Sequence, residues 1–281
     1  MTYLVTGATG GLGGYALNYL KELVPMSDIY ALVRSEEKGA DLKAAGFNIR
    51  IGDYSDVESM KQAFAGIDRV LFVSGAPGNR QVEHENVVNA AKEAGVSYIA
   101  YTSFAGADKS TSALAEDHFF TEKVIEKSGI AHTFLRNNWY FENEMPMIGG
   151  ALSAGKFVYA AENGKVGWAL KREYAEVAAK AVAGADFPEI LELSGPLMTY
   201  EELTKALKEA TGKDFDVISS DDKGFVENLV SVGLPQPVAE MFLSFQHDIK
   251  NDQLDVTSDD FEKALGKPLT DRVDALRELL K

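Results

Sequence analysis

The sequence predicts an α/β fold, a doubly wound parallel sheet followed by a smaller, mostly helical C-terminal lobe. Three observations predict it. An apolar run near the N-terminus leads into a cluster of glycines, and five more apolar runs then alternate with helix-length segments. This alternation stops after Arg136, where the pattern becomes aromatic and polar. The first two observations are typical of the Rossmann fold, and the third indicates a second region.

The glycine cluster lies between an expected strand and an expected helix. Tyr3 to Val5 is apolar, glycines follow at positions 7, 10 and 13, and an apolar-periodic segment covers 15–24. In such a turn Gly7 allows the tight bend and Gly10 lets the backbone approach a pyrophosphate, while Gly13 lets the helix pack closely on the strand. The free N–H groups of the helix N-terminus would face the phosphates. The alternative is a glycine-rich loop without a ligand; its position between strand and helix favours the dinucleotide site.

Five further strands and the helices between them complete the predicted sheet. The strands are expected at 29–33, 47–51, 69–74, 97–103 and 132–136. The intervening helices should end at glycines, namely Gly46, Gly66, Gly95 and Gly129. Ser55 and Glu58 have the spacing of a capping box that opens the third helix.

The second half of the chain predicts one more strand and several helices. A helix is expected at 172–184 and a strand at 189–193, which closes the sheet. Thr199 and Glu202 form a second capping box, whose helix should end near Gly212. A short strand from 215 and helices at 221–233, 235–248 and 271–281 follow. We therefore predict a Rossmann domain at 1–194, with 138–165 contributing to the cleft, and a smaller lobe at 195–281.

Composition excludes several classes of function. The 281 residues carry 28 Lys and Arg against 43 Asp and Glu, a net charge of −15, which argues against nucleic acid and anionic membranes as partners. With no cysteine there is no disulfide, thiol nucleophile or cysteine metal site, and no metal is expected. No apolar run approaches the roughly 18 residues of a membrane span. The first strand begins so near the start that no signal peptide is expected. These features predict a cytoplasmic protein.

The end of the second strand predicts the choice of cofactor. A carboxylate there would select the free ribose 2′-OH of NAD, whereas an arginine accommodates a 2′-phosphate. The sequence has Arg34 followed by Ser35, and no acid. Arg34 can bind a phosphate with its planar guanidinium. NADP is therefore preferred over NAD; the alternative is that Arg34 is a solvated surface residue.

Two more loops should reach the same edge of the sheet. Asp53 follows the third strand and could accept from the adenine amino group, although a turn residue at a helix entry is as good an explanation. Ser74, Gly75 and Ala76 follow the fourth strand, where small residues would let the backbone lie against the cofactor. Both loops lie at carboxyl ends of strands, where such sheets bind ligands.

The catalytic tyrosine of short-chain dehydrogenases is missing. That class places Tyr-x-x-x-Lys on the helix after strand five, so that both side chains share one face. None of the 11 tyrosines has lysine four residues later, and in the expected helix Phe119 stands four residues before Lys123. Lys123 could still bind the nicotinamide ribose; alternatively it pairs with Glu122 or Glu126 at the surface. His118 would face another direction, which favours a structural or exposed position over a catalytic one.

The segment after strand six is rich in aromatic residues. Asn137, Asn138, Trp139, Tyr140 and Phe141 follow one another at the expected nicotinamide end of the sheet. Aromatic side chains there could stack against a planar substrate. Alternatively, Trp139 or Phe141 packs between the lobes.

These motifs resemble the NmrA-like branch of atypical short-chain dehydrogenases. The similar segments, which cover the first half and the strand-six loop, are 5–13, 31–34, 52–54, 100–103, 121–123 and 135–143. The strand-six segment is long and specific, and is most similar to bacterial short-type NADPH:quinone oxidoreductases and to triphenylmethane reductase. The resemblance continues through 231–235 and so covers the whole chain.

The resemblance implies an NADPH site and its residues. Contacts are implied for Gly7, Ala8, Thr9, Gly10, Gly11, Leu12, Arg34, Ser74, Gly75, Ala76, Asn138, Trp139, Tyr140, Phe141, Glu142 and Asn143, with Lys171 as a further contact. Relatives in this branch that lack activity sense NADP and regulate protein partners.

The sequence thus predicts an NADPH-dependent reductase of quinones or similar small planar acceptors. The alternative is a non-catalytic NADP sensor that binds a protein partner. A sugar-nucleotide epimerase is disfavoured, because that reaction needs the missing tyrosine as its base. The sequence leaves open whether the chain forms a homo-oligomer and which acceptor is physiological.

Overall fold

The computed structural model describes all 281 residues, which form two units. The first unit comprises 1–137, 171–193 and 263–266; the second comprises 138–170, 194–262 and 267–281. The chain therefore passes from the first unit to the second and back before it completes either. The domain boundaries predicted from the sequence remain a prediction.

The first unit is built on a seven-stranded sheet. Its strands in chain order are β1 (Tyr3–Val5), β2 (Ile29–Val33), β3 (Asn48–Ile51), β4 (Arg69–Phe72), β5 (Tyr98–Phe104), β6 (Ala131–Asn137) and β10 (Ile190–Leu193). The spatial order is β10-β6-β5-β4-β1-β2-β3, and every pair is parallel. The predicted doubly wound parallel sheet is confirmed. From β1 the chain adds β2 and β3 on one side of the sheet, and it then adds β4, β5, β6 and β10 on the other side. The boundary between β1 and β4 is therefore a switch point, which is where open α/β sheets bind ligands.

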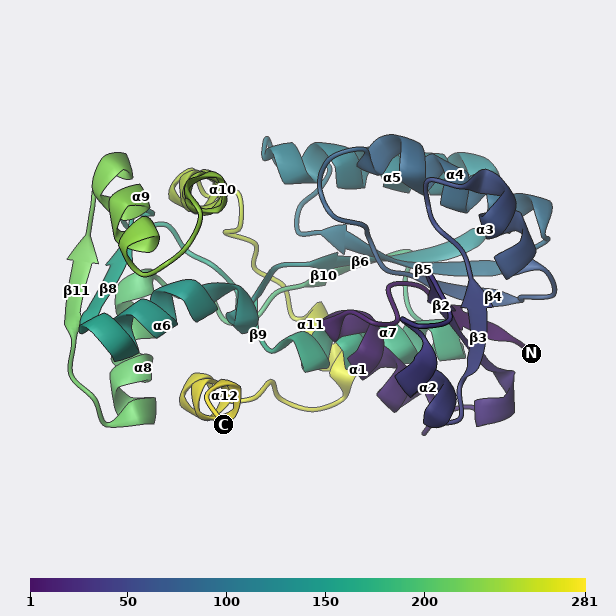
Figure 1. Ribbon diagram of the computed structural model, residues 1–281, viewed down its shortest axis with the longest axis horizontal. Helices are drawn as coiled ribbons and strands as arrows, with labels where there is room; N and C mark the ends of the chain where they lie inside the picture. The colour runs from purple at the N-terminus through teal and green to yellow at the C-terminus, as the bar shows by residue number, and fades with distance from the viewer. The chain divides into compact units, whose positions relative to one another are not determined.

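Helices cover both faces of this sheet (Figure 1). One face carries α3 (Val57–Phe64), α4 (Arg80–Glu93) and α5 (Ala113–Ser128), and the other α1 (Gly11–Leu20), α2 (Ala40–Ala44) and α7 (Lys171–Ala183). A parallel sheet covered in this way is buried on both sides, which explains why its strands are nearly continuous apolar runs.

Helix α7 is the most deeply buried of these helices. Nine of its thirteen residues are buried, and it packs against α1, β4 and β5. Arg69 of β4 holds its C-terminal end, donating from Nε to the Val182 carbonyl (2.6 Å) and from Nη2 to the Ala181 carbonyl (3.1 Å). A cation at a helix C-terminus satisfies carbonyls that have no partner within the helix.

The predicted helix ends are largely correct, with one exception at a start. Gly46, Gly66, Gly95 and Gly129 all have φ between 73° and 96°, the left-handed conformation that ends helices. The Thr199–Glu202 capping box is present. The capping box predicted at Ser55 is wrong: Asp56 is the N-cap and accepts from the N–H groups of Glu58 and Ser59.

The second unit is mostly helical. Its strands are β7 (Trp139–Tyr140), β8 (Lys156–Tyr159), β9 (Trp168–Ala169) and β11 (Asp216–Ser219), which form two short parallel pairs, β8 with β11 and β7 with β9. Its helices are α6 (Met145–Ala154), α8 (Tyr200–Thr211), α9 (Asp222–Ser231), α10 (Gln236–Lys250) and α12 (Arg272–Leu279), and α11 (Asp260–Leu265) belongs to both units. Two 3₁₀ turns complete the chain, Met26–Asp28 in the first unit and Phe141–Glu144 in the second.

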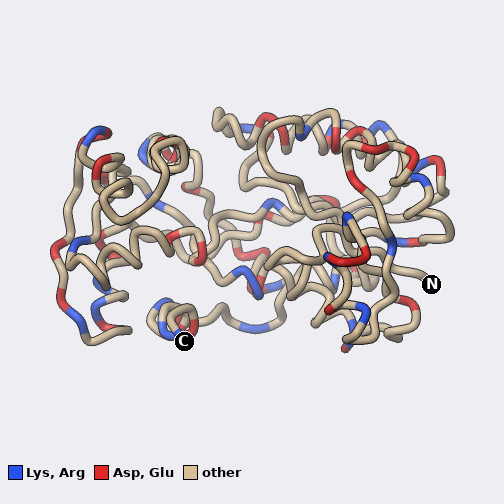
Figure 2. The backbone as a smooth tube through the Cα atoms, in the orientation of Figure 1, with Lys and Arg blue, Asp and Glu red and all other residues tan.

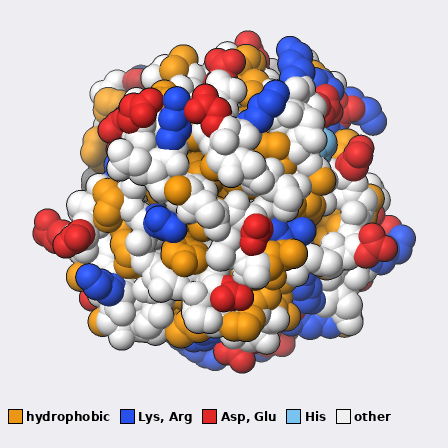
Figure 3. Space-filling view, turned by 90° about the vertical axis from the view of Figure 1, so that its right-hand side faces the viewer, with side chains coloured by type: hydrophobic (Ala, Val, Ile, Leu, Met, Phe, Trp, Pro, Cys, Tyr) orange, Lys and Arg blue, Asp and Glu red, His pale blue; other side chains and the backbone are white.

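Charged side chains of both signs are interspersed over the fold. Figure 2 shows Lys and Arg among Asp and Glu along the helices of both units. On the face shown in Figure 3, both signs alternate with apolar side chains, and no large basic patch is present. No helix is both long enough and apolar enough to span a bilayer.

Candidate cofactor site

A cavity of about 800 Å³ lies in the first unit, where β1 to β4 end. Its lining combines the glycine turn with the loops that follow the next three strands. The lining residues are Gly7, Thr9, Gly10, Leu32, Val33, Arg34, Lys38, Gly52, Asp53, Tyr54, Val73, Ser74, Gly75, Ala76, Pro77, Asn79 and Glu83. Eight residues proposed from the sequence as cofactor contacts therefore meet in one cavity, at the switch point of the sheet.

The glycine turn has no room for side chains. Gly7 has φ +59°, and Gly10 N donates to Gly7 O (2.9 Å). A Cβ on Gly13 would lie 2.2 Å from Gly7 O, too close for any side chain, and one on Gly10 would lie 3.2 Å from that oxygen. No side chain caps the N-terminus of α1, so its first N–H groups are available to an anion. The turn thus fits the pyrophosphate of a dinucleotide.

The remaining predicted residues of the turn support this cradle. Ala8 and Leu12 are buried, and Leu12 lies in the first turn of α1. Lys171, at the start of α7, covers Gly11: a Cβ on Gly11 would lie 3.1 Å from Lys171 Cδ. A lysine in this position adds a positive charge beside the phosphate-binding turn.

Two cations line the cavity beyond β2. Arg34 and Lys38 are both exposed, and the intervening turn is held by Ser35 Oγ, which accepts from Lys38 N (3.2 Å). Lys38 was not identified from the sequence, because a lysine in an exposed charged segment has no distinguishing pattern. Glu36 and Glu37 lie between these cations but do not line the cavity. Arg34 directly after β2, with Lys38 nearby, fits a 2′-phosphate better than a free 2′-OH.

Asp53 lines the same cavity and also organises its own turn. Asp53 Oδ1 accepts from Ser55 N (2.9 Å) and Ser55 Oγ (2.6 Å). These hydrogen bonds, with a smaller contribution from Arg34, hold the pKa of Asp53 below its ordinary value. The carboxylate is therefore ionised at neutral pH, and these hydrogen bonds engage only its Oδ1. Both sequence-based explanations, turn residue and ligand contact, are compatible with this position.

Tyr54 is a cavity residue that sequence reasoning missed. Its hydroxyl lies 2.5 Å from Thr6 Oγ1 and donates to Val73 O (2.9 Å), so it ties the ends of β1 and β4 together. Burial raises its pKa far above the ordinary value. Tyr54 is therefore a neutral phenol that shapes the cavity, not an acid for a reaction.

Lys123 is placed on the exposed side of α5. Its side chain is 44% exposed, its Nζ lies 2.8 Å from Glu126 Oε2, and it lies over the ring of Phe119. Lys123 is not among the residues that line the cavity. Its role toward the ribose remains a proposal.

Glu122, the other partner considered for Lys123, is buried and binds elsewhere. Its carboxylate accepts from Arg136 Nε (2.9 Å) and Nη2 (2.8 Å), and from Ser103 Oγ (2.6 Å). Arg136 also binds Glu192 (3.0 Å) and Asp108. This buried network ties the ends of β5, β6 and β10 to α5. His118 is buried as well, and its Nδ1 is bound to the hydroxyl of Tyr101 (2.9 Å), so its position is structural.

The segment after β6 begins the second unit, and its large side chains are held there. Asn138 is buried; its Nδ2 donates to Ser194 Oγ (3.1 Å) and Leu254 O (3.0 Å), and its Oδ1 has no partner. Trp139 packs on Phe245, and Phe141 stacks on Trp168. Tyr140, Glu142 and Asn143 are half-buried.

Glu144 is a third residue that sequence reasoning missed, after Lys38 and Tyr54. Its buried carboxylate accepts from the indole N–H of Trp139 (3.0 Å) and of Trp168 (2.9 Å), and from the hydroxyl of Tyr200 (3.1 Å). Burial raises the pKa of Glu144 to about 7, although these three donors oppose the shift. Glu144 fixes the segment after β6 to β9 and α8. The only available signal was a glutamate between two apolar segments, which is common at surfaces.

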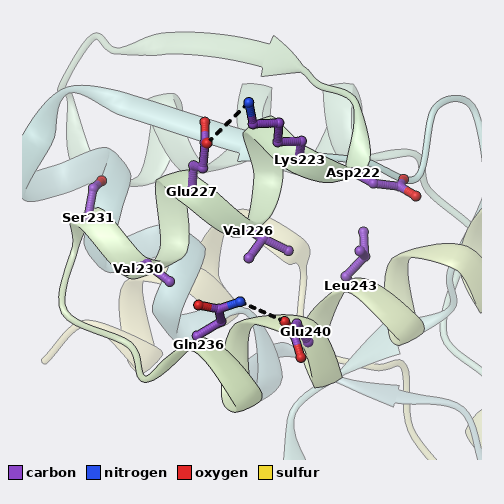
Figure 4. Close-up of a pocket in the computed structure, with 9 residues that line it drawn as sticks. All are labelled: Asp222, Lys223, Val226, Glu227, Val230, Ser231, Gln236, Glu240 and Leu243. Carbon is purple, nitrogen blue, oxygen red and sulfur yellow. Dashed lines mark hydrogen bonds and ion pairs between the residues drawn. The ribbon is translucent and has the colours of Figure 1, made fainter.

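The second unit has a cavity of its own, about 700 Å³ in volume, between α9 and α10 (Figure 4). Val226 and Leu243 point into it from the two helices. Its polar side chains pair with each other: Lys223 with Glu227 (3.7 Å), and Gln236 with Glu240 (2.9 Å). It has no cluster of cations and no glycine turn, so it lacks the features that bind a dinucleotide in the first unit.

Known proteins resemble this chain over its whole length. Quinone oxidoreductase 2 of Escherichia coli (strain K12) is 37% identical, over 98% of this chain and 97% of that protein. A crystal structure of the NADPH-dependent quinone oxidoreductase of Escherichia coli complexed with NADPH superposes with a TM-score of 0.93, at 36% identity, and covers 100% of both chains. Triphenylmethane reductase of Citrobacter sp. superposes with a TM-score of 0.92, at 34% identity, over 100% of this chain and 99% of that one.

A family description agrees with the geometry of the cavity. The family model described as NAD(P)H-binding matches residues 7–182, which is more than half of the chain and begins at the glycine turn. The matched segment contributes every residue that lines the cavity at the ends of β1 to β4. This chain therefore belongs to the NAD(P)H-binding family.

Proposed function

We propose that this protein is an NADPH-dependent reductase that transfers hydride to quinones or similar planar electrophilic acceptors. The observation that carries the proposal is the cavity where the turn of Gly7, Gly10 and Gly13 meets Arg34 and Lys38. The similarity to an NADPH-dependent quinone oxidoreductase over the full chain supports it.

Different residues of the first unit would bind different parts of the cofactor. The glycine turn and the N-terminus of α1 would hold the pyrophosphate, with Lys171 beside them. Arg34 and Lys38 would bind the 2′-phosphate, and Asp53 would accept from the adenine amino group. The loop Ser74 to Ala76 would lie against the adenosine half. When bound, NADPH supplies the hydride.

The acceptor class follows from the residue at the tyrosine position. Reduction of an ordinary ketone produces an alkoxide, which must be protonated as it forms, and a positioned acid does this in related enzymes. Phe119 has no proton to give. A quinone instead yields an aromatic hydroquinone anion, which water can protonate later, and a cationic triaryl dye needs no proton. The missing acid therefore favours strongly electrophilic, planar acceptors.

We propose that Lys123 positions the nicotinamide ribose. We also propose that the segment 138–143 forms one wall of the acceptor site. A lysine that binds the nicotinamide ribose would orient the ring for hydride transfer. Tyr140 and its aromatic neighbours would stack against a planar acceptor. The segment's anchoring by Glu144 supports this role, because a rigid wall orients a ligand better than a mobile one.

We also propose that the protein acts in the cytoplasm on small molecules. The net charge of −15 and the mixing of charges seen in Figure 3 are unsuited to a nucleic-acid partner. The absence of cysteine is compatible with a reducing compartment.

Steady-state oxidation of NADPH with a panel of acceptors tests the proposal. Benzoquinones and naphthoquinones should be reduced without added flavin or metal, and simple aldehydes and ketones far more slowly. Robust oxidation of alcohols with NADP and no quinone turnover would refute it. Tight binding of NADPH with no turnover of any acceptor would instead support a sensor that binds a protein partner.

A further inference from the structure

Two side chains of α4 anchor the loop after β4 by hydrogen bonds. Gly75 N donates to His84 Nε2 (3.0 Å), and Gly75 O accepts from Arg80 Nε (3.0 Å) and Nη2 (2.8 Å). Both side chains are buried, with 0% of His84 and 4% of Arg80 exposed. Gly75 lines the cofactor cavity, so the two polar groups of a cavity residue are engaged by the protein itself.

The hydrogen bonds around His84 are consistent with only one tautomer. An amide N–H can only donate, so His84 Nε2 must carry a lone pair and its proton must be on Nδ1. Nδ1 lies 2.8 Å from Thr121 Oγ1, and Thr121 in turn donates its hydroxyl proton to Asp117 O (2.9 Å), leaving its oxygen free to accept. The chain Gly75 to His84 to Thr121 to Asp117 therefore runs in one direction, from the cavity loop to the backbone of α5.

The surroundings of His84 keep its ring neutral. Burial and the nearby charge of Arg80 lower the pKa of His84 to about 3. A protonated imidazole has two donors and no acceptor, and it could not accept from Gly75. Arg80 thus has two effects, since it binds the Gly75 carbonyl and disfavours a charge on the ring beneath the Gly75 amide.

We infer that His84 is a positioning residue of the cofactor site, which accepts the Gly75 N–H and fixes the loop 74–76 in the form that binds NADPH. This inference rests on the proposed function, because it assigns that loop to the cofactor. Ser74 N donates to Thr102 Oγ1 (2.9 Å). The amides of both Ser74 and Gly75 are therefore hydrogen-bonded to side chains of the protein. The loop therefore presents a wall whose form is set before the cofactor arrives, and preorganisation of this kind raises affinity by reducing the ordering that binding requires.

Two substitutions of His84 separate this role from packing. In His84→Gln the side-chain amide oxygen can lie near the position of Nε2 and accept from Gly75, while the contact with Thr121 is lost. In His84→Asn the shorter amide lies near the position of Nδ1 and retains Thr121, while Gly75 loses its acceptor. Each variant loses one hydrogen bond, but only the asparagine leaves the loop amide unpaired.

We expect the dissociation constant for NADPH, measured by titration calorimetry, to rise about tenfold in His84→Asn and to remain within about threefold of the wild type in His84→Gln. Val88→Ala, one turn further along α4 and in the core, controls for loss of stability. It should lower the melting temperature without the tenfold loss of affinity. Equal affinities in the two His84 variants would overturn the inference, whereas a wild type that does not bind NADPH would overturn the proposed function.

Nuclear magnetic resonance of the unmodified protein gives a test that needs no variant to fold. The His84 ring should be the neutral, Nδ1-protonated tautomer at pH 7 and still at pH 5, and the Gly75 amide should exchange slowly with solvent before NADPH is added. An Nε2-protonated ring, or a Gly75 amide that becomes protected only when NADPH binds, would contradict it.

Discussion

A Cβ on Gly13 would lie 2.2 Å from the carbonyl oxygen of Gly7, whereas one on the adjacent Gly14 would meet its nearest neighbour, Ala8 O, at 3.7 Å. The two glycines therefore differ sharply in their tolerance of a methyl group, although they are consecutive residues of α1. The contact explains why the third glycine of the motif is required: α1 begins directly against the turn that ends β1.

Gly13→Ala should separate α1 from the turn and disrupt the phosphate cradle. We expect a loss of stability of about 1–3 kcal/mol, as for other overpacked sites, and a strong loss of NADPH affinity. Gly14→Ala is the matched control and should preserve affinity, with a small gain from helix propensity. Thermal unfolding and NADPH titration of both variants check this; equal effects at both positions would contradict the packing described above.

Arg34→Ala should remove most of the preference for NADPH over NADH. A charge-assisted hydrogen bond is worth about 1.5–3 kcal/mol, so the ratio of the two dissociation constants should fall roughly tenfold to a hundredfold. Lys38→Ala should act in the same direction but more weakly, because a lysine binds phosphate without the bidentate geometry. Arg50→Ala removes the same charge outside the cavity and should leave the ratio unchanged. Equal affinity of the unmodified protein for both cofactors would exclude the 2′-phosphate site.

Lys123→Ala tests the proposed contact with the nicotinamide ribose. Misplacement of the hydride donor can lower the rate by about a hundredfold. Glu126→Ala is the control, because it frees the lysine amine from its surface ion pair, which contributes only about 0–1 kcal/mol to stability, and should preserve turnover. If Lys123→Ala leaves both turnover and NADPH affinity unchanged, its role is confined to the surface.

Phe119→Tyr returns a phenol to the position where short-chain dehydrogenases have their acid. We expect it to increase the rate with ketones more than with quinones, because only the ketone product must be protonated as it forms. The ratio of kcat/KM values for a matched ketone and quinone measures this. A larger gain for quinones would mean that protonation also limits quinone reduction, which would contradict this argument.

Glu144 should make stability depend on pH. Because burial raises its pKa from 4.5 to about 7, the folded protein keeps a proton there that the unfolded chain has lost. Its contribution to stability is therefore full below pH 4.5 and is lost as the pH rises to 7, by at most about 1.4 kcal/mol for each pH unit. Glu144→Gln does not titrate, so the unfolding free energy of the wild type relative to this variant should fall between pH 5 and 7 and then level off. A difference independent of pH would contradict this assignment.

The fold of the first unit could be predicted because its sequence signals are local. The strands away from the β3 edge are short, mostly buried apolar runs, and each of four helices is followed by a glycine with positive φ. These features depend on neighbouring residues alone. The elements of the second unit depend on distant partners. β8 pairs with β11 some 60 residues later, and α6 contains Pro146, Gly149 and Gly150, which are poor helix formers in isolation. Neither β8 nor α6 was predicted, whereas β11 and the helices α8, α9, α10 and α12 were.

The cofactor site, like the fold, could be predicted only where its residues belong to a local sequence motif. The glycine turn and Arg34 have positions fixed by the motif, so they could be assigned from the sequence. Lys38, Tyr54 and His84 belong to the site through tertiary contacts alone, and the hydrogen bond from Gly75 to His84 joins a loop to the helix that follows it. The Ser55 error has a local origin instead, because the adjacent Asp56 competes for the same helix start and is an equally good N-cap residue.

The burial of α7 has a consequence for biosynthesis. During translation the first 137 residues leave the ribosome before α7 and β10, which complete the central sheet of the first unit and the cover of one of its faces. Until then the part of the sheet that α7 covers and the β6 edge lie open, and an exposed strand edge invites pairing with other chains. About thirty residues of the second unit must be synthesised in between. The nascent chain therefore exposes the α7-binding part of the sheet and its β6 edge while residues 138–193 are synthesised.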